Sequence, residues 1–224
     1  MIWLLTCEHY SNGLPLRYAE HFVKAIEVLE SPRGYDVRVA PLYIRLEPLF
    51  DEARYFRYSR LLIDPERSIQ DKQLFSPFTS QLTIAEKADI TSRYYHPYRT
   101  GIQKFIEQYI DQGVFHIALH SFHPFQGNRN RESSIGIVFN SSDTSARSLA
   151  VLLRRTIKEH DPALKIRFNY PYRGNRVSFL DYLRNSFPEN YIGLQLNVRN
   201  DDILDLRKTI YESLASLRGI LKED

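Results

Sequence analysis

The sequence predicts an α/β protein in which helices cover a mostly parallel sheet. Short apolar runs that are typical of buried strands alternate with segments of helical periodicity, from "MIWLLT" at the start to a helix over about 202–221. Strands that alternate with helices favour a parallel sheet with helices packed against it. The chain has 224 residues, of which 43% are hydrophobic, and this is enough for one full core. We therefore expect a single domain over residues 1–224.

The first part of the chain is expected to begin with a strand, a loop and a helix. "MIWLLT" is the strand, and "YAEHFVKAIEVL" places five residues on one helical face, namely Tyr18, Phe22, Ala25, Ile26 and Leu29. Residues 36–59 fit either an extended segment or a helix, because "DVRVAPLYI" alternates weakly while the leucines that follow have helical spacing. We favour a helix after Pro41.

The remaining elements alternate more clearly. Thr83 and Glu86 form a capping-box pattern that starts a helix running toward residue 112, with a kink or break expected at Pro97. Strands are expected at 114–119, 135–139, 165–170 and 191–198, and helices at 144–160, 178–186 and 202–221. A long polar loop, "HSFHPFQGNRNRESS", separates the first two of these strands, and such loops often carry function.

The charge balance argues against a dedicated nucleic-acid binder. Thirty basic residues against 27 acidic ones give a net charge of only +3, whereas such binders carry a strong positive footprint. Arginine supplies 22 of the 30 basic residues. This excess is compatible with recognition of a small anionic ligand, because guanidinium groups bind carboxylates in a bidentate way, but the base composition of the genome explains it equally well.

The sequence contains no sign of secretion or of a membrane span. A single cysteine excludes an internal disulfide. No stretch has the charged start and apolar run of a signal peptide, or the roughly 18 apolar residues that a membrane span needs. We expect a cytoplasmic protein that has no membrane or nucleic-acid partner.

Residues that could bind a metal follow three of the predicted strands. Ligands of open α/β sheets bind beyond the carboxyl ends of the strands. The polar residues found there are Glu8 and His9, His120 and His123, and Gln195, Asn197 and Arg199. Two histidines and a carboxylate could hold zinc. Seven histidines in the chain would also place some at strand ends by chance, so spacing alone leaves both explanations open.

Five motifs in order give the chain a family resemblance. They are "CEHYSNGLP", "SRLLIDPER", "LHSFHPF" with Arg131 before "IGIV", "NYPY" and "VRNDDI". Together they span residues 4–203 and resemble the N-formylglutamate amidohydrolase family. In that family the second motif is Ser-Arg-Leu-x-x-Asp-x-Asn-Arg. Taken without the resemblance, Arg60, Asp64 and Arg67 of this motif would be a salt-bridged surface turn.

The resemblance implies a three-layer phosphorylase/hydrolase-like fold, with a mostly parallel mixed sheet, that is related to zinc carboxypeptidases. It also implies metal-dependent release of formate from N-formyl-L-glutamate, a reaction that ends a histidine degradation route in some organisms. His9 and His120 would bind a divalent metal, zinc above all, with Glu8 or Asp36 as a carboxylate ligand and His96 as a further candidate. The residues implied for binding the small anionic N-acyl amino acid are Arg60, Asp64, Arg67, Arg131, Asn169, Tyr172 and Arg199.

Three departures from the family pattern bear on catalysis. Asn197 occupies the catalytic position where relatives commonly carry the glutamate that would act as general base, and an amide cannot accept a proton as a carboxylate does. Arg99 replaces the histidine of a Pro-Tyr-His segment, and Ala118 replaces a carboxylate that would support the metal site. The alternative function is therefore a family member that has lost catalysis and binds or senses a small anion.

Overall fold

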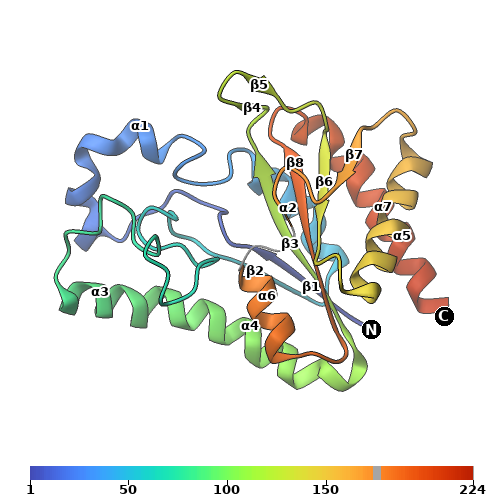
Figure 1. Cartoon of the computed structure of the whole chain (residues 1–224), viewed down its shortest axis with the longest axis horizontal. Coiled ribbons are helices and arrows are strands. Elements are labelled where there is room, and N and C mark those ends of the chain that lie inside the picture. The colour runs from blue at the N-terminus through green and yellow to red at the C-terminus, as the bar shows by residue number, and fades with distance from the viewer. Residues whose placement is uncertain (174–177, 224) are drawn as a thin grey trace.

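The computed structural model describes residues 1–173 and 178–223, with a six-stranded sheet at its centre (Figure 1). The strands are β1 (Ile2–Cys7), β2 (Glu52–Tyr55), β3 (Val114–Phe122), β6 (Ile135–Val138), β7 (Ile166–Phe168) and β8 (Tyr191–Arg199). They lie in the order β2-β1-β3-β8-β6-β7. Strands β2, β1, β3 and β8 are parallel, whereas β6 is antiparallel to β8 and parallel to β7. The predicted α/β fold with a mixed, mostly parallel sheet is confirmed.

Helices cover both faces of this sheet (Figure 1). One face packs against α2 (Val39–Leu46), α5 (Thr144–His160) and α7 (Ile203–Glu223) in the larger apolar core. The other face packs against α4 (His96–Tyr109) and α6 (Phe179–Ser186). Two short helices, α1 (Ile26–Leu29) and α3 (Ile84–Ile90), lie beside the sheet, and a small ribbon of β4 (Phe125–Gln126) and β5 (Arg129–Asn130) extends from the end of β3.

Strand β3 is buried along its whole length because it lies between β1 and β8 with helices on both sides. Its residues alternate between the two cores: Phe115 and Ile117 enter the larger one, and Val114 and Ala118 enter the smaller one. A parallel strand buried on both faces needs an almost continuous apolar sequence. This explains why "VFHIAL" predicts a strand so clearly, and it places His120 on the face of the smaller core.

The helical segment that begins after Thr83 continues past Pro97. Thr83 and Glu86 form the predicted capping box. Helix α3 then passes through a widened π-helical turn, Thr91–Tyr95, into α4, which has Pro97 in its first turn. Proline lacks the N–H that an α-helix would use, and a π-turn reorganises the hydrogen bonds at such a point. Among the described residues, no helix is long and apolar enough to cross a membrane.

Two expectations about the first part of the chain need correction. Glu52–Tyr55 is the edge strand β2, paired with β1, rather than the end of the helix that follows Pro41. A four-residue edge strand has too few residues to show a period, so pairing with β1 decides its structure. Residues Leu16–Ala25 form a 3-10 helix before α1, although the expected positions Tyr18 and Phe22 are buried.

A buried histidine links three strands on the face that carries His120. His116 of β3 lies 2.7 Å from the Thr6 hydroxyl through Nε2 and 2.7 Å from the Tyr191 hydroxyl through Nδ1. A neutral imidazole satisfies both contacts, because one ring nitrogen donates and the other accepts. Burial lowers the pKa of His116 from 6.5 to about 4. The fold therefore requires the uncharged ring.

We expect this histidine to make the protein less stable as the pH falls from about 6.5 to about 4. The unfolded chain takes up a proton near pH 6.5, whereas the folded chain resists protonation down to about pH 4. The stabilisation is therefore complete above pH 6.5 and is lost as the pH falls, by about 3 kcal/mol in all. Denaturant unfolding between pH 7.5 and 4.5 should show a smaller loss for His116→Gln than for wild type. His21→Gln, at an exposed position, should follow the wild type, and equal losses in all three proteins would contradict this account.

Candidate active site

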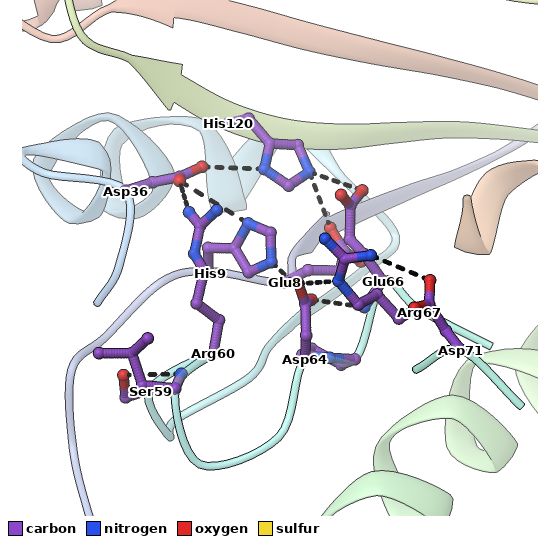
Figure 2. Close-up of polar contacts among 12 residues, drawn as sticks. Glu8, His9, Asp36, Ser59, Arg60, Asp64, Glu66, Arg67, Asp71 and His120 are labelled. Carbon is purple, nitrogen blue, oxygen red and sulfur yellow. Dashed lines mark hydrogen bonds and ion pairs between the residues drawn. The ribbon is translucent and has the colours of Figure 1, made fainter. Parts of the chain in front are cut away.

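The carboxyl ends of β1 and β3 bring two histidines together. His9 follows β1 and His120 lies near the end of β3, as expected for parallel neighbours. Their ring centroids are 5.1 Å apart, and each residue is 3% exposed. Figure 2 shows both rings surrounded by carboxylates, from Glu8 beside His9 and from two further segments that carry Asp36 and Asp64 with Glu66. The strand-end prediction thus located the centre of a buried polar site.

His120 is oriented by one carboxylate and faces two others. Its Nδ1 lies 2.8 Å from Oδ2 of Asp36, while its Nε2 lies 3.3 Å from Oε1 of Glu66 and 3.4 Å from Oε2 of Glu8. Burial lowers the pKa of His120, but the charge of Glu66 and the contacts with Asp36 and Glu8 raise it well above its ordinary value. Two carboxylates therefore place negative charge beside Nε2 of His120.

Asp36 lies behind His120 and uses both of its carboxylate oxygens within the protein. Oδ2 accepts from the Ser121 backbone N–H at 3.0 Å and contacts His120, while Oδ1 forms a short ion pair with Arg60. Burial raises the pKa of Asp36, but the Arg60 charge and His120 outweigh burial and hold it well below its usual range. Asp36, predicted as a metal ligand, is thus placed where it orients a ligand. Its Oδ1 also lies 3.7 Å from Nδ1 of His9.

The loop before α3 supplies two further carboxylates, Asp64 and Glu66. Asp64 accepts from His9 Nε2 at 2.9 Å, from the Glu66 backbone N–H at 3.1 Å and from Arg67 Nε at 3.2 Å. Burial raises the pKa of Asp64, but the charge and hydrogen bond of His9 outweigh it and keep the pKa low. The loop therefore binds His9 and turns Glu66 toward His120 in one short segment (Figure 2).

Glu66 is the site residue that the sequence analysis missed. Its carboxylate is 22% exposed and reaches His120 from a loop, at the place where the family motif has asparagine. The available signal was that substitution in "SRLLIDPER", since it adds an acidic group two residues after Asp64. Among the described residues, His9, Glu66 and His120 can each offer one ligand atom within 4.8 Å of the others.

The donor set fits a divalent metal. Imidazole and carboxylate are ligands of zinc. Two buried polar atoms, Oε2 of Glu8 and Nε2 of His120, have no hydrogen-bond partner among the described residues and lie 3.4 Å apart. Buried polar atoms without partners are costly, and a bound ion relieves that cost. Oε1 of Glu8 accepts from the Tyr98 hydroxyl at 3.0 Å, so Glu8 remains a candidate ligand.

A cavity of about 380 Å³ opens over these groups, which is a size suited to a small ligand. Of the residues predicted to bind substrate, four line it: Arg60, Asp64, Arg67 and Tyr172. Arg67 also pairs with Asp71 at 2.9 Å, and its side chain is 36% exposed. Positive charge and an aromatic hydroxyl therefore lie beside the histidines.

The three other predicted substrate residues lie outside the set that lines this cavity. Arg199 pairs with Asp202 at 2.8 Å, and Arg131 donates to the His123 carbonyl at 3.1 Å. Asn169 has a left-handed backbone conformation with φ of 50°, and its side-chain oxygen accepts from the backbone N–H of Phe139 at 3.0 Å. These contacts give the three residues a role in holding loops together.

Asn197 lies beside His120 but is not among the residues that line the cavity. The two residues are in register on β8 and β3, and Asn197 is fully buried. Its Oδ1 accepts from Nε2 of Gln195 at 3.2 Å, and Gln195 itself lines the cavity. Ala118 lies two residues before His120 on the same face of β3 and packs in the smaller core. The exposed His96 is not among the cavity residues.

Comparison with known proteins agrees with the fold and the motifs. A crystal structure of a gene product from Agrobacterium tumefaciens matches with a TM-score of 0.82 at 24% identity, covering 98% of this chain and 91% of that one. N-formylglutamate amidohydrolase from Ralstonia eutropha JMP134 matches with a TM-score of 0.74 at 17% identity, covering 99% and 94%. At these identities the two matches establish the fold. A search of curated proteins gave no match.

The sequence model of one family covers most of the chain. N-formylglutamate amidohydrolase matches residues 1–204, a range that includes β1, β3, β8 and every residue of the site described above. The family that the five motifs resemble is therefore confirmed, and the chain belongs to the N-formylglutamate amidohydrolase family.

Proposed function

We propose that this protein is a metal-dependent hydrolase of a small N-acyl acidic amino acid, and that N-formyl-L-glutamate, cleaved to formate and L-glutamate, is its first candidate substrate. The observation that carries the proposal is the convergence of His9, Glu66 and His120 within 4.8 Å at the base of a cavity. Zinc is the metal that best suits two imidazoles and a carboxylate. We further propose that the enzyme is cytoplasmic and serves histidine degradation.

The metal would polarise the formyl oxygen and make water a stronger nucleophile at neutral pH. The protein's part is to hold the ligands in one orientation. Asp36 accepts from Nδ1 of His120 and Asp64 contacts Nε2 of His9, so each imidazole has a carboxylate that fixes its ring. These two aspartates also keep negative charge close to the metal position.

Hydrolysis also needs a group that takes the proton of the attacking water. Asn197 cannot do so, because its side chain is an amide, and it is fully buried and not among the cavity residues. Glu8 and Glu66 both border Nε2 of His120. One of these carboxylates would serve as a ligand of a metal bound there, and the other would be free to accept the proton. The site therefore contains enough carboxylates for catalysis without a glutamate at position 197.

The anionic part of the substrate would bind to the arginines of the cavity. Arg60 and Arg67 line the cavity next to the histidines. Arg67 is the better placed for exchange, because its partner Asp71 is a partly exposed carboxylate that a substrate carboxylate can replace. Tyr172, which also lines the cavity, would add a hydrogen bond. This arrangement would orient the acyl group toward His120.

The direct test is formate release from N-formyl-L-glutamate by tag-free protein, first stripped with a chelator and then supplied with zinc. We expect turnover that depends on added metal and that falls by at least about 100-fold in His120→Ala, because this variant loses a metal ligand. His123→Ala is the matched control, since His123 is an exposed histidine three residues away. Its rate should equal that of wild type.

Two outcomes would refute the proposed site. One is normal turnover by His120→Ala. The other is a rate that is the same in stripped and zinc-loaded protein.

A second prediction concerns Asp64. Asp64→Asn keeps the shape of the side chain but removes the negative charge that contacts His9, so zinc affinity should fall by about 10- to 100-fold. Competition against a chromophoric chelator measures this affinity. Asp71→Asn removes a partner of Arg67 that does not contact His9 and should bind zinc as wild type does. Equal affinities in all three proteins would show that Asp64 does not support the metal.

The alternative function, a family member that binds an anion without hydrolysing it, is favoured by one observation, the amide at position 197. Asn197→Glu distinguishes the two functions. If Glu8 and Glu66 supply the chemistry, the variant gains no rate, and it loses stability because a carboxylate is buried at a fully buried position. If the natural protein is impaired, wild type should bind N-formyl-L-glutamate calorimetrically without releasing formate, and Asn197→Glu should gain at least tenfold in rate. Asn197→Gln controls for the change in volume.

A further inference from the structure

A buried arginine lies behind the loop that carries Glu66. Arg99 is in α4, at a position where the family pattern has histidine, and it is only 7% exposed. It is not among the residues that line the cavity. The arginine that replaces histidine is therefore a buried cation behind the site, and its contacts show which part of the site it holds.

Arg99 binds the backbone on both sides of Glu66. Its Nη1 donates to the Pro65 carbonyl at 2.8 Å and to the Arg67 carbonyl at 3.2 Å. The Tyr95 hydroxyl donates to the same Arg67 carbonyl at 2.7 Å. Two carbonyls of a short loop are thus held by one planar group, which restricts the rotation of the peptide units that set the direction of the Glu66 side chain.

The guanidinium group is itself held in place by aromatic rings. Its central carbon lies 4.0 Å from the ring centroid of Phe179, 4.9 Å from that of Tyr182 and 5.1 Å from that of Tyr95. Such contacts favour a buried cation. They come from α6 and from the turn before α4, so Arg99 joins the loop to two helices.

The charge of Arg99 also interacts with the carboxylates of the site. Burial lowers the pKa of Arg99, while Tyr95, Tyr182, Glu8 and Glu66 raise it. The residue before it, Tyr98, donates directly to Glu8. Adjacent residues of α4 therefore support the two carboxylates that border Nε2 of His120, Tyr98 through a side-chain hydrogen bond and Arg99 through the loop.

We infer that Arg99 is a positioning residue that holds the Glu66 carboxylate against His120 by binding the Pro65 and Arg67 carbonyls. The inference rests on the proposed function, because it gives Glu66 a part in metal binding. It also gives the replacement of histidine by arginine in this chain a physical purpose: a guanidinium reaches two carbonyls and stacks on aromatic rings, and it stays charged when buried.

The test is a double-mutant cycle read by zinc affinity, measured by competition with a chromophoric chelator. Arg99→Met should weaken zinc binding by about 10-fold, as expected for loss of a group that orients a ligand. Glu66→Gln should weaken it at least as much. The double variant should bind zinc as Glu66→Gln alone does, because Arg99 acts through Glu66. Arg99→Lys, which keeps the charge and one donor nitrogen but loses the planar guanidinium, should lie between wild type and Arg99→Met.

Arg93→Met is the matched control, because Arg93 is an exposed arginine of the preceding turn that pairs with Asp89. It should leave zinc affinity unchanged. A melting temperature for each variant separates a local effect from unfolding, and Arg99→Lys replaces Arg99→Met in the cycle if the latter does not fold.

The outcomes separate this inference from the proposed function. If wild type binds no zinc, both are overturned. If wild type binds zinc and Arg99→Met binds it equally well, only the role of Arg99 is overturned. A third outcome is that Arg99→Met weakens zinc binding by the same factor in wild type and in the Glu66→Gln variant. Arg99 then acts on the fold as a whole, and the inference is also overturned.

Discussion

The site depends on Asp36 and the contacts that its carboxylate makes. One oxygen binds His120 and the backbone of Ser121 at the end of β3, and the other pairs with Arg60. The backbone N–H of Asp36 donates to the His9 carbonyl at 2.8 Å. One buried residue therefore ties the ends of two strands to the loop that supplies the acidic groups. Burial of a carboxylate is costly unless its charge is paired, and Arg60 and His120 offset that cost here.

The sequence was sufficient for the fold because the deciding elements are long or periodic. The helix Thr144–His160 has the predicted bounds, and β3 and β8 are recognisable as apolar runs since both are buried between neighbours. Strand β2 was not predictable in the same way. Its four residues have no period of their own, and they become a strand because β1 offers an edge to which they can pair.

Within the site, the sequence correctly indicated the two histidines whose positions depend on the order of the strands. His9 and His120 follow from the rule that ligands bind at the carboxyl ends of parallel strands. The rule says nothing of Glu66, because a loop places it. Its direction depends on a local hydrogen bond with Asp64 and on Arg99, which lies more than 30 residues further along the chain. Asn169 and Arg199 show the opposite case, in which the motif residue is correctly recognised but the structure gives its side chain contacts within neighbouring loops.

Two of the departures from the family pattern, Asn197 and Arg99, gain meaning when they are considered in space together with Glu66. Asn197 places an amide on the strand beside His120, whereas Glu66 places a carboxylate against the same histidine from a partly exposed loop. A carboxylate on a loop is held less firmly than one on a central strand. The arginine at position 99 binds the backbone on both sides of that carboxylate and is fixed by three aromatic rings. An amide at position 197 is therefore compatible with the proposed hydrolysis, since the same chain contains a second carboxylate beside His120 and the contacts that would hold it.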